Sequence, residues 1–161
     1  MSIDGSHPPQ VVMAARPTAE RCRLEVFPQH QVMQARYGDM DVNGHLNNVA
    51  LESFHEDIRA RQTREMFPDA HHPTKRQFRV VAAQSIVHFL AEAHWPATIT
   101  AAVGVSHIGR TSLVATTGLF IDGRCISICD TAIVLVGNDG PEVIPELNRQ
   151  LLQSRLIRKP N

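Results

Sequence analysis

The spacing of apolar and polar residues predicts which parts of the chain are extended and which are helical. Residues 25–37 read as a strand, in which Met33 and Ala35 alternate with polar residues. From Leu46 the apolar residues recur at three- and four-residue steps, the spacing of one face of a helix. This helix is expected to end near Phe67, because the proline that follows disfavours helical angles at the residue before it.

The region from residue 79 to 137 is strand-like almost throughout. The runs rich in Val, Ile, Thr and Phe are predicted as strands at residues 85–92, 99–107, 111–121 and 125–136. Asp122-Gly123 separates the last two runs, and this dipeptide is a strong hairpin signal. Pro145 suits the first position of a short terminal helix. The order of strand, long helix and four strands predicts an α+β fold, in which an antiparallel sheet covers one helix with its apolar face.

The length of 161 residues fits one domain. Residues 1–22 contain three prolines and show no sustained period, so we expect a mobile leader before a domain at residues 23–156 and a basic tail at residues 157–161. Sixteen Lys and Arg residues balance sixteen Asp and Glu residues, which argues against a nucleic-acid-binding protein.

Further classes of protein are disfavoured by individual residues. The three cysteines form no CxxC pair, which indicates neither a disulfide framework nor a zinc site, and Cys125 and Cys129 are expected to share one face of a strand. The adjacent His71 and His72 have no spaced third ligand, so we predict no metal and no cofactor. No apolar run reaches 18 residues and no secretory signal is recognised, so the expected location is cytoplasmic, without a membrane span.

Candidate catalytic residues gather between Asp41 and Asn48, at the start of the predicted long helix. Free N–H groups and the positive end of the helix dipole meet there, which favours a developing oxyanion. Asp41 could attack an electrophile or take a proton from water. The layout is typical of acyl transfer or hydrolysis without a serine or cysteine nucleophile, but Asp and Asn before a helix are also common simply as caps.

The segment from Tyr37 to Asn48 carries a specific signature, an Asp followed by Gly-His-x-Asn-Asn. With it, the chain resembles the hotdog-fold acyl-CoA thioesterases of the 4-hydroxybenzoyl-CoA thioesterase type over roughly residues 31–152. The later strands match this family mainly in pattern. The resemblance implies a hotdog fold, with about five antiparallel strands around one long helix, and hydrolysis of an acyl thioester to the free acid and CoA.

The resemblance also implies roles for individual residues. In that family the acid at the position of Asp41 is the nucleophile or general base, and the backbone N–H at the position of Asn48 polarises the thioester carbonyl. The segment is similar as well to the acyl-ACP thioesterases of plastids, whose Asp-x-Asn-x-His pattern matches Asp41, Asn43 and His45. A strand glutamate used there corresponds to Glu92.

Substrate-binding residues are expected in a tight turn, at Gly109, Arg110, Thr111 and Ser112. The Arg110 guanidinium could bind CoA phosphates, since arginine contacts phosphate through two parallel hydrogen bonds. Two positions depart from the family. Leu51 stands where tyrosine is usual, and His94-Trp95-Pro96 stands where Gly-Asp is common.

Several alternatives stay open. The carrier could be CoA or acyl carrier protein, and the acyl group is not specified. A non-catalytic acyl-CoA binding or sensor protein is possible on the same fold. A hotdog enoyl-CoA hydratase is a further alternative, although its Asp-x-Asn-Pro-x-His pattern places the last two residues one position further apart than Asn43 and His45. Edge strands expose unpaired backbone groups, and the resemblance implies a homodimer or homotetramer with sites between protomers.

Overall fold

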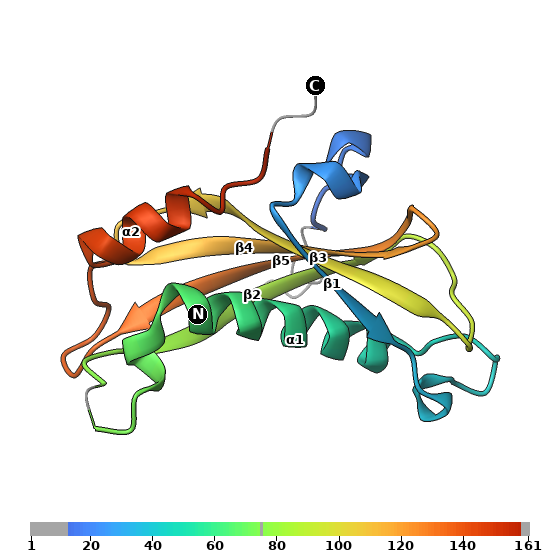
Figure 1. The fold of residues 1–161 in the computed structure, drawn as a ribbon, viewed down its shortest axis with the longest axis horizontal. Coiled ribbons are helices and arrows are strands. Elements are labelled where there is room, and N and C mark those ends of the chain that lie inside the picture. The colour runs from blue at the N-terminus through green and yellow to red at the C-terminus, as the bar shows by residue number, and fades with distance from the viewer. Residues whose placement is uncertain (1–12, 75, 159–161) are drawn as a thin grey trace, which may run out of the picture.

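The computed structural model describes residues 13–74 and 76–158, and its central feature is one antiparallel sheet against one long helix (Figure 1). The sheet has five strands in the spatial order β1-β3-β4-β5-β2. The helix α1 (Asn48–Met66) lies across one face of this sheet. The α+β prediction is therefore confirmed.

β3, β4 and β5 agree with the predicted runs to within one residue at each end, whereas β1 is shorter than the predicted residues 25–37 and β2 is displaced from the predicted residues 85–92. Their bounds are Gln29–Gln34 for β1, Arg79–Phe89 for β2, Thr98–Ile108 for β3, Ser112–Ile121 for β4 and Arg124–Val136 for β5. β2 begins before the predicted residue 85, because residues 79–82 pair with residues 133–136 of β5. This segment lies within the region 79–137 predicted as strand-like, although the run predicted at residues 85–92 leaves it out. The terminal helix α2 (Glu146–Gln153) follows Pro145 as expected.

The main core lies between α1 and the middle of the sheet. Leu51 and Ile58 of α1 are buried and belong to one cluster with Ile99, Ala101 and Val103 of β3. The buried face of α1 also carries His55 and Gln62, two polar residues that the predicted apolar stripe does not include. Among the described residues, no helix combines the length and the apolar character needed to cross a membrane.

Cys125 and Cys129 lie on opposite faces of the sheet, so the prediction that they share a face is wrong. Leu119 pairs with Ser127 whereas Phe120 pairs with Cys125, which marks a β-bulge. The extra residue in β5 reverses the alternation of side chains on either side of it. Cys125 consequently packs in the cluster of Phe27 and Phe120 on the outer face, while Cys129 lies beneath α1.

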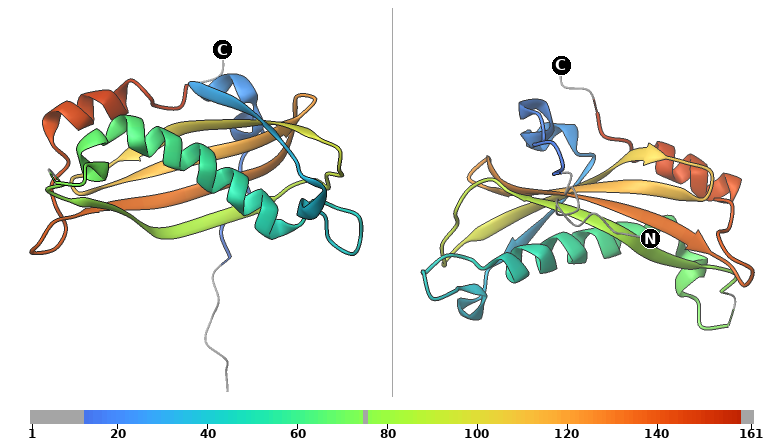
Figure 2. Two further views of the ribbon diagram at one scale, coloured as in Figure 1. Left: turned by 60° about the horizontal axis from the view of Figure 1, so that its bottom comes forward. Right: turned by 180° about the vertical axis from the view of Figure 1, so that it is seen from behind.

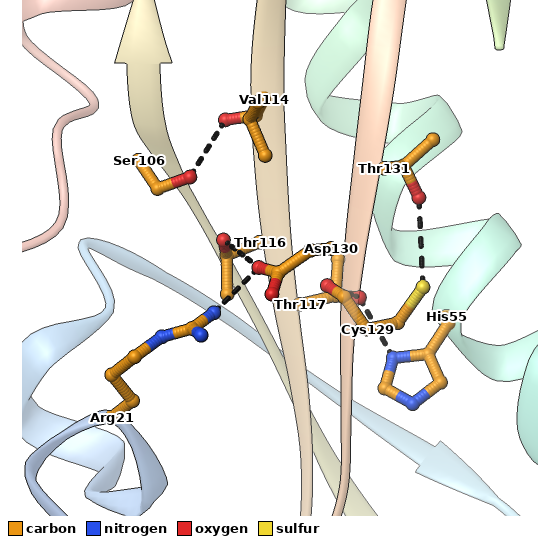
Figure 3. A network of polar contacts seen from close by, with 9 residues as sticks. All are labelled: Arg21, His55, Ser106, Val114, Thr116, Thr117, Cys129, Asp130 and Thr131. Carbon is orange, nitrogen blue, oxygen red and sulfur yellow. Dashed lines mark hydrogen bonds and ion pairs between the residues drawn. The ribbon is translucent and has the colours of Figure 1, made fainter. Parts of the chain in front are cut away.

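The face of the sheet opposite α1 is covered by the two ends of the described chain (Figure 2). Short 3₁₀ helices lie there at Ala19–Cys22 (η1) and Leu24–Val26 (η2). Arg21 of η1 donates to Asp130 of β5 at 2.5 Å, and Thr116 donates to the same carboxylate oxygen at 2.5 Å (Figure 3). The packed part of the chain thus begins before the predicted boundary at residue 23, while residues 1–12 of the predicted leader lie outside the described residues.

The C-terminal segment pairs with backbone groups of the same region. Ile157 N–H donates to Val105 O at 2.9 Å, and Arg158 N–H donates to Val26 O at 2.8 Å. The first two residues of the predicted basic tail are therefore part of the fold, and residues 159–161 lie outside the described residues.

Candidate active site

The loop between β1 and α1 is held by a buried carboxylate. Asp39 lies in a short 3₁₀ helix, η3 (Tyr37–Asp39), and accepts hydrogen bonds from the Arg36 N–H at 2.7 Å and from the Arg36 guanidinium at 2.9 Å. Burial alone would raise the pKa of Asp39, but these hydrogen bonds and the charge of Arg36 outweigh it and lower that pKa. The Asp39 carbonyl also accepts from the Asn47 N–H at 2.8 Å. Asp39 is therefore a structural residue that ties η3 to the start of α1.

Asp41 begins a tight turn that ends at His45. Asp41 Oδ1 accepts from the Asn43 N–H at 2.8 Å and from the His45 N–H at 3.2 Å. The Asp41 carbonyl accepts from the Gly44 N–H at 3.1 Å, and Gly44 adopts a φ of 78° that few other residues tolerate. Both side-chain hydrogen bonds end on Oδ1, so within the described part of the chain Oδ2 makes no hydrogen bond. That oxygen is available to water or to a substrate carbonyl.

The helix α1 starts two residues later than the predicted Leu46. Asn47 is its N-cap, and the Asn47 side chain accepts from the Ala50 N–H at 2.7 Å. The Leu51 N–H donates to the Asn47 carbonyl at 3.1 Å. The N–H groups of Asn48 and Val49 have no acceptor inside the helix, since the first N–H groups of any helix lack one. Asn48 is an exposed residue at the first position of α1, where a free N–H group can stabilise an oxyanion.

Glu92 comes to the same place from the segment that follows β2. Its carboxylate lies 3.5 Å from His45 Nε2, and the Leu46 N–H donates to the Ala93 carbonyl at 2.7 Å. These residues surround a cavity of about 260 Å³ whose walls include Asp41, His45, Asn48 and Glu92, with Leu46 and Leu51 among its apolar residues. The structure thus brings together four of the five predicted catalytic residues.

Asn43 contacts Asp41 through its backbone. Its side chain is exposed and does not line this cavity, whereas its backbone N–H donates to Asp41 Oδ1. The contribution of Asn43 that the structure shows is to the shape of the turn. This contribution needs the backbone and not the amide side chain.

The predicted substrate-binding turn lies at the opposite end of the sheet (Figure 1). Residues Gly109–Thr111 connect β3 to β4 and contact the region of α2. Arg149 donates to the Gly109 carbonyl at 2.8 Å, and the Ile144 N–H donates to the Arg110 carbonyl at 2.9 Å. β3 spans its eleven residues between this turn and the Asp41 end, a length of roughly 33 Å. Within one chain, therefore, Gly109–Ser112 are not brought to Asp41.

A second cavity, of about 270 Å³, lies between α1 and the strands β2 and β5. It begins at Val49, next to Asn48, and its walls include Glu56, Arg59, Ser85 and His55. The Arg59 guanidinium is largely buried, and it forms an ion pair with Glu56. Burial lowers the pKa of Arg59. The wall of this cavity therefore includes a charged pair.

His55 forms part of the wall of that cavity and is one of the residues that sequence reasoning missed. Its Nε2 lies 2.9 Å from the Ser127 hydroxyl, which itself donates to the His88 carbonyl at 3.0 Å. Its Nδ1 lies 2.7 Å from the Thr117 hydroxyl (Figure 3). Burial lowers the pKa of His55 to about 3, so the imidazole is neutral at physiological pH.

His94 is the other missed residue, and it lies beside His45. Its Nδ1 is 3.0 Å from the Gly44 carbonyl oxygen, so the side chain of His94 supports the turn that begins at Asp41. The signal in the sequence was the departure at His94-Trp95-Pro96. This departure indicates that position 94 is unusual, but it does not predict that His94 lies beside His45.

The sequence matches the thioesterase-like superfamily over residues 35–152, so the chain belongs to this family. This assignment confirms the resemblance predicted from the signature. No curated protein matches the chain significantly.

Solved structures share the fold over most of their length. Protein PA5185 from Pseudomonas aeruginosa aligns with a TM-score of 0.74 at 20% identity, covering 86% of this chain and 99% of that one. A thioesterase superfamily protein from Jannaschia sp. CCS1 has a TM-score of 0.69 at 25% identity and covers 76% and 79% of the two chains. A thioesterase from Thermus thermophilus, solved with coenzyme A and Zn, has a TM-score of 0.68 at 22% identity, covering 79% and 98%. The fold is the hotdog fold, as predicted.

Proposed function

We propose that the protein is an acyl-CoA thioesterase whose reaction takes place in the cavity at the start of α1. The observation that carries this proposal is that Asp41, which uses only Oδ1 in its side-chain hydrogen bonds, and Asn48, the first residue of α1, line one cavity. A nucleophile or base beside an oxyanion donor is what thioester hydrolysis needs. Family membership supports the same chemistry.

In the proposed reaction, the Asn48 N–H stabilises the growing negative charge on the thioester carbonyl oxygen. Asp41 either attacks the carbonyl carbon or removes a proton from a water molecule that attacks it. The C–S bond then breaks and the thiolate of CoA leaves, taking up a proton. If Asp41 attacks, water hydrolyses the resulting mixed anhydride. Both routes consume one water molecule and release one acid and one thiol.

His45 and Glu92 are proposed as orienting residues. The His45 N–H fixes Asp41 Oδ1, and the Glu92 carboxylate, 3.5 Å from His45 Nε2, can hold a water molecule at the cavity wall. Asn43 is proposed to support the turn through its backbone N–H.

We further propose that the acyl group occupies the second cavity, which begins at Val49. Its polar residues, Ser85 and the Glu56–Arg59 pair among them, disfavour a long aliphatic chain, because such a chain would displace water from these groups without offering them hydrogen bonds. A short acyl group, or one with polar substituents, is expected there.

The experiment that tests the function is a screen for thiol release. Short, long and aromatic acyl-CoAs, and the matching acyl carrier protein thioesters, are each incubated with the protein, and enoyl-CoA hydration is followed in parallel. Release of free CoA with one acyl class supports the proposal. Hydration without thiol release indicates a hydratase, and tight acyl-CoA binding without either reaction indicates a sensor. Both of these results contradict hydrolysis.

We propose a homodimer, or a pair of such dimers, with the site completed between protomers. β2 is a sheet edge, and its Val81 and Phe89 are 41% and 40% exposed in the single chain. The unpaired backbone groups of such an edge strand can form hydrogen bonds with a second copy of the chain. A partner's Gly109–Ser112 turn could then bind the CoA phosphates of a substrate held near Asp41. Light scattering that gives a monomer at micromolar concentration, with full activity, would contradict this assembly.

A further inference from the structure

His45 and His94 lie side by side because the backbone pairs them. The two residues form an isolated antiparallel β-bridge, next to the hydrogen bond from Leu46 N–H to the Ala93 carbonyl. Their ring centroids are 4.9 Å apart, with the ring planes at 79°. Main-chain pairing thus brings the backbones that carry the two imidazoles side by side.

Glu92 adds a carboxylate to this pair. Its oxygen lies 3.5 Å from His45 Nε2, and one ligand atom from each of His45, Glu92 and His94 lies within 4.8 Å of the other two. Glu92 is exposed, so a small change of its rotamer can move its carboxylate toward an ion held at the roughly 2.0–2.2 Å that zinc adopts with nitrogen and oxygen ligands. Two histidines and one carboxylate are a common ligand set for this ion.

His94 already has the protonation pattern of a metal ligand. Its Nδ1 lies 3.0 Å from the Gly44 carbonyl oxygen, which can only accept, so Nδ1 carries the proton and Nε2 offers a free lone pair. Metal-binding histidines commonly donate their second N–H to a backbone carbonyl, which fixes the tautomer and the ring orientation. This hydrogen bond distinguishes His94 from a histidine that is merely close to a carboxylate.

We propose that His45, Glu92 and His94 form a three-ligand site for a zinc-class divalent cation at the rim of the Asp41 cavity. Three protein ligands leave the fourth position of a tetrahedral ion for water. The site draws on two segments, the turn before α1 and the segment after β2, so a bound ion joins them.

Resting on the proposed function, we expect this ion to inhibit the enzyme. It takes the His45 ring and the Glu92 carboxylate away from the water that they would orient, and it places a positive charge near Asp41. A neighbouring cation weakens a carboxylate as a nucleophile or base. Zinc would therefore regulate turnover at the same cavity.

Binding is tested first, without reference to activity. The full chain is stripped with a chelator and titrated with ZnCl₂ by calorimetry, and Co²⁺ is used as a spectroscopic substitute. We expect one ion per chain at this site, and a loss of affinity of at least about 10–100-fold in His94→Ala. His107→Ala, which removes a histidine at the other end of β3, is the matched control and should bind like the parent. No binding by the parent, or equal affinity in His94→Ala, overturns the proposal.

The regulatory step is tested with a substrate found by the thiol-release screen. Zinc should reduce the turnover of the parent and of His107→Ala at concentrations that leave His94→Ala at its own metal-free rate. Equal inhibition of all three proteins overturns the regulation. Because binding is measured separately, a protein that binds zinc but hydrolyses no thioester contradicts the proposed function and leaves the metal site supported.

Discussion

Asp41 and His45 are joined by two hydrogen bonds. The Asp41 N–H donates to the His45 carbonyl at 2.8 Å, and the His45 N–H donates to Asp41 Oδ1 at 3.2 Å. The carboxylate is therefore fixed by backbone groups before any substrate arrives. Because the carboxylate is already held in place, no free energy is needed to order it during the reaction.

Replacing Asp41 by Asn separates catalysis from the shape of the turn. Asparagine keeps an acceptor for the Asn43 and His45 N–H groups but removes the negative charge. We expect kcat to fall by about 10²–10⁴-fold, the usual cost of a lost general base, while acyl-CoA still binds. Steady-state thiol release measures this, with calorimetry for binding.

Asp139→Asn is the control for Asp41→Asn, since Asp139 is an exposed aspartate in another loop. It should leave kcat unchanged. If Asp41 were only a capping residue, Asp41→Asn would change the free energy of unfolding by about 1 kcal/mol or less and leave turnover intact. A folded Asp41→Asn protein with more than about a tenth of the parent rate would exclude Asp41 as the catalytic acid.

Arg110→Ala tests whether the distant turn binds the nucleotide of CoA. The Arg110 side chain is exposed, while its carbonyl is used by the Ile144 N–H, so the substitution spares the fold. We expect KM for acyl-CoA to rise with kcat nearly unchanged, the pattern of lost uniform binding. A short acyl-pantetheine, which lacks the nucleotide, should be hydrolysed equally well by both proteins. An equal loss with this substrate would show that Arg110 has another role.

Asp39→Ala tests whether the Asp39 carboxylate stabilises the loop between β1 and α1. The change leaves the Arg36 N–H without its acceptor, and a lost hydrogen bond to a charged group costs about 1.5–3 kcal/mol. Urea unfolding at neutral pH should show a destabilisation of this order. Because the pKa of Asp39 is lowered in the folded state, its contribution is present above the ordinary aspartate pKa and is lost as the pH falls. An equal destabilisation in acid and at neutral pH would contradict this origin.

The sequence predicted the parts of the site that are local in the chain. Asp41, His45 and Asn48 fall within one turn of loop and the start of one helix, so their spacing alone brings them together. Glu92 was found only through the family resemblance, because its place depends on how the segment after β2 meets the loop. His94 could not be found, since its pairing with His45 is a tertiary β-bridge.

Other differences between prediction and structure have equally specific causes. The β-bulge in β5 moved Cys125 to the outer face, and a strict two-residue alternation cannot anticipate an inserted residue. His55 lies on the buried face of α1 beside Ile58. The spacing of apolar residues could not predict this, because histidine is polar. Its partners, Thr117 and Ser127, come from two strands that only the folded sheet brings under α1.

The buried His55 should make the stability of the protein depend on pH. Its pKa is about 3 in the folded protein, whereas an unfolded histidine titrates near 6.5. Between these values the unfolded chain binds a proton that the folded one does not, so stability falls as the pH drops below about 6.5. The slope is roughly 1.4 kcal/mol per pH unit from this one group. Urea unfolding at pH values of about 7.5, 6 and 5, which bracket the unfolded histidine pKa, measures this slope.

His55→Gln, which cannot titrate, should lose most of that slope, whereas His107→Gln, at an exposed position, should keep it. Parallel profiles for the parent and His55→Gln would mean that His55 does not stay neutral in the folded core.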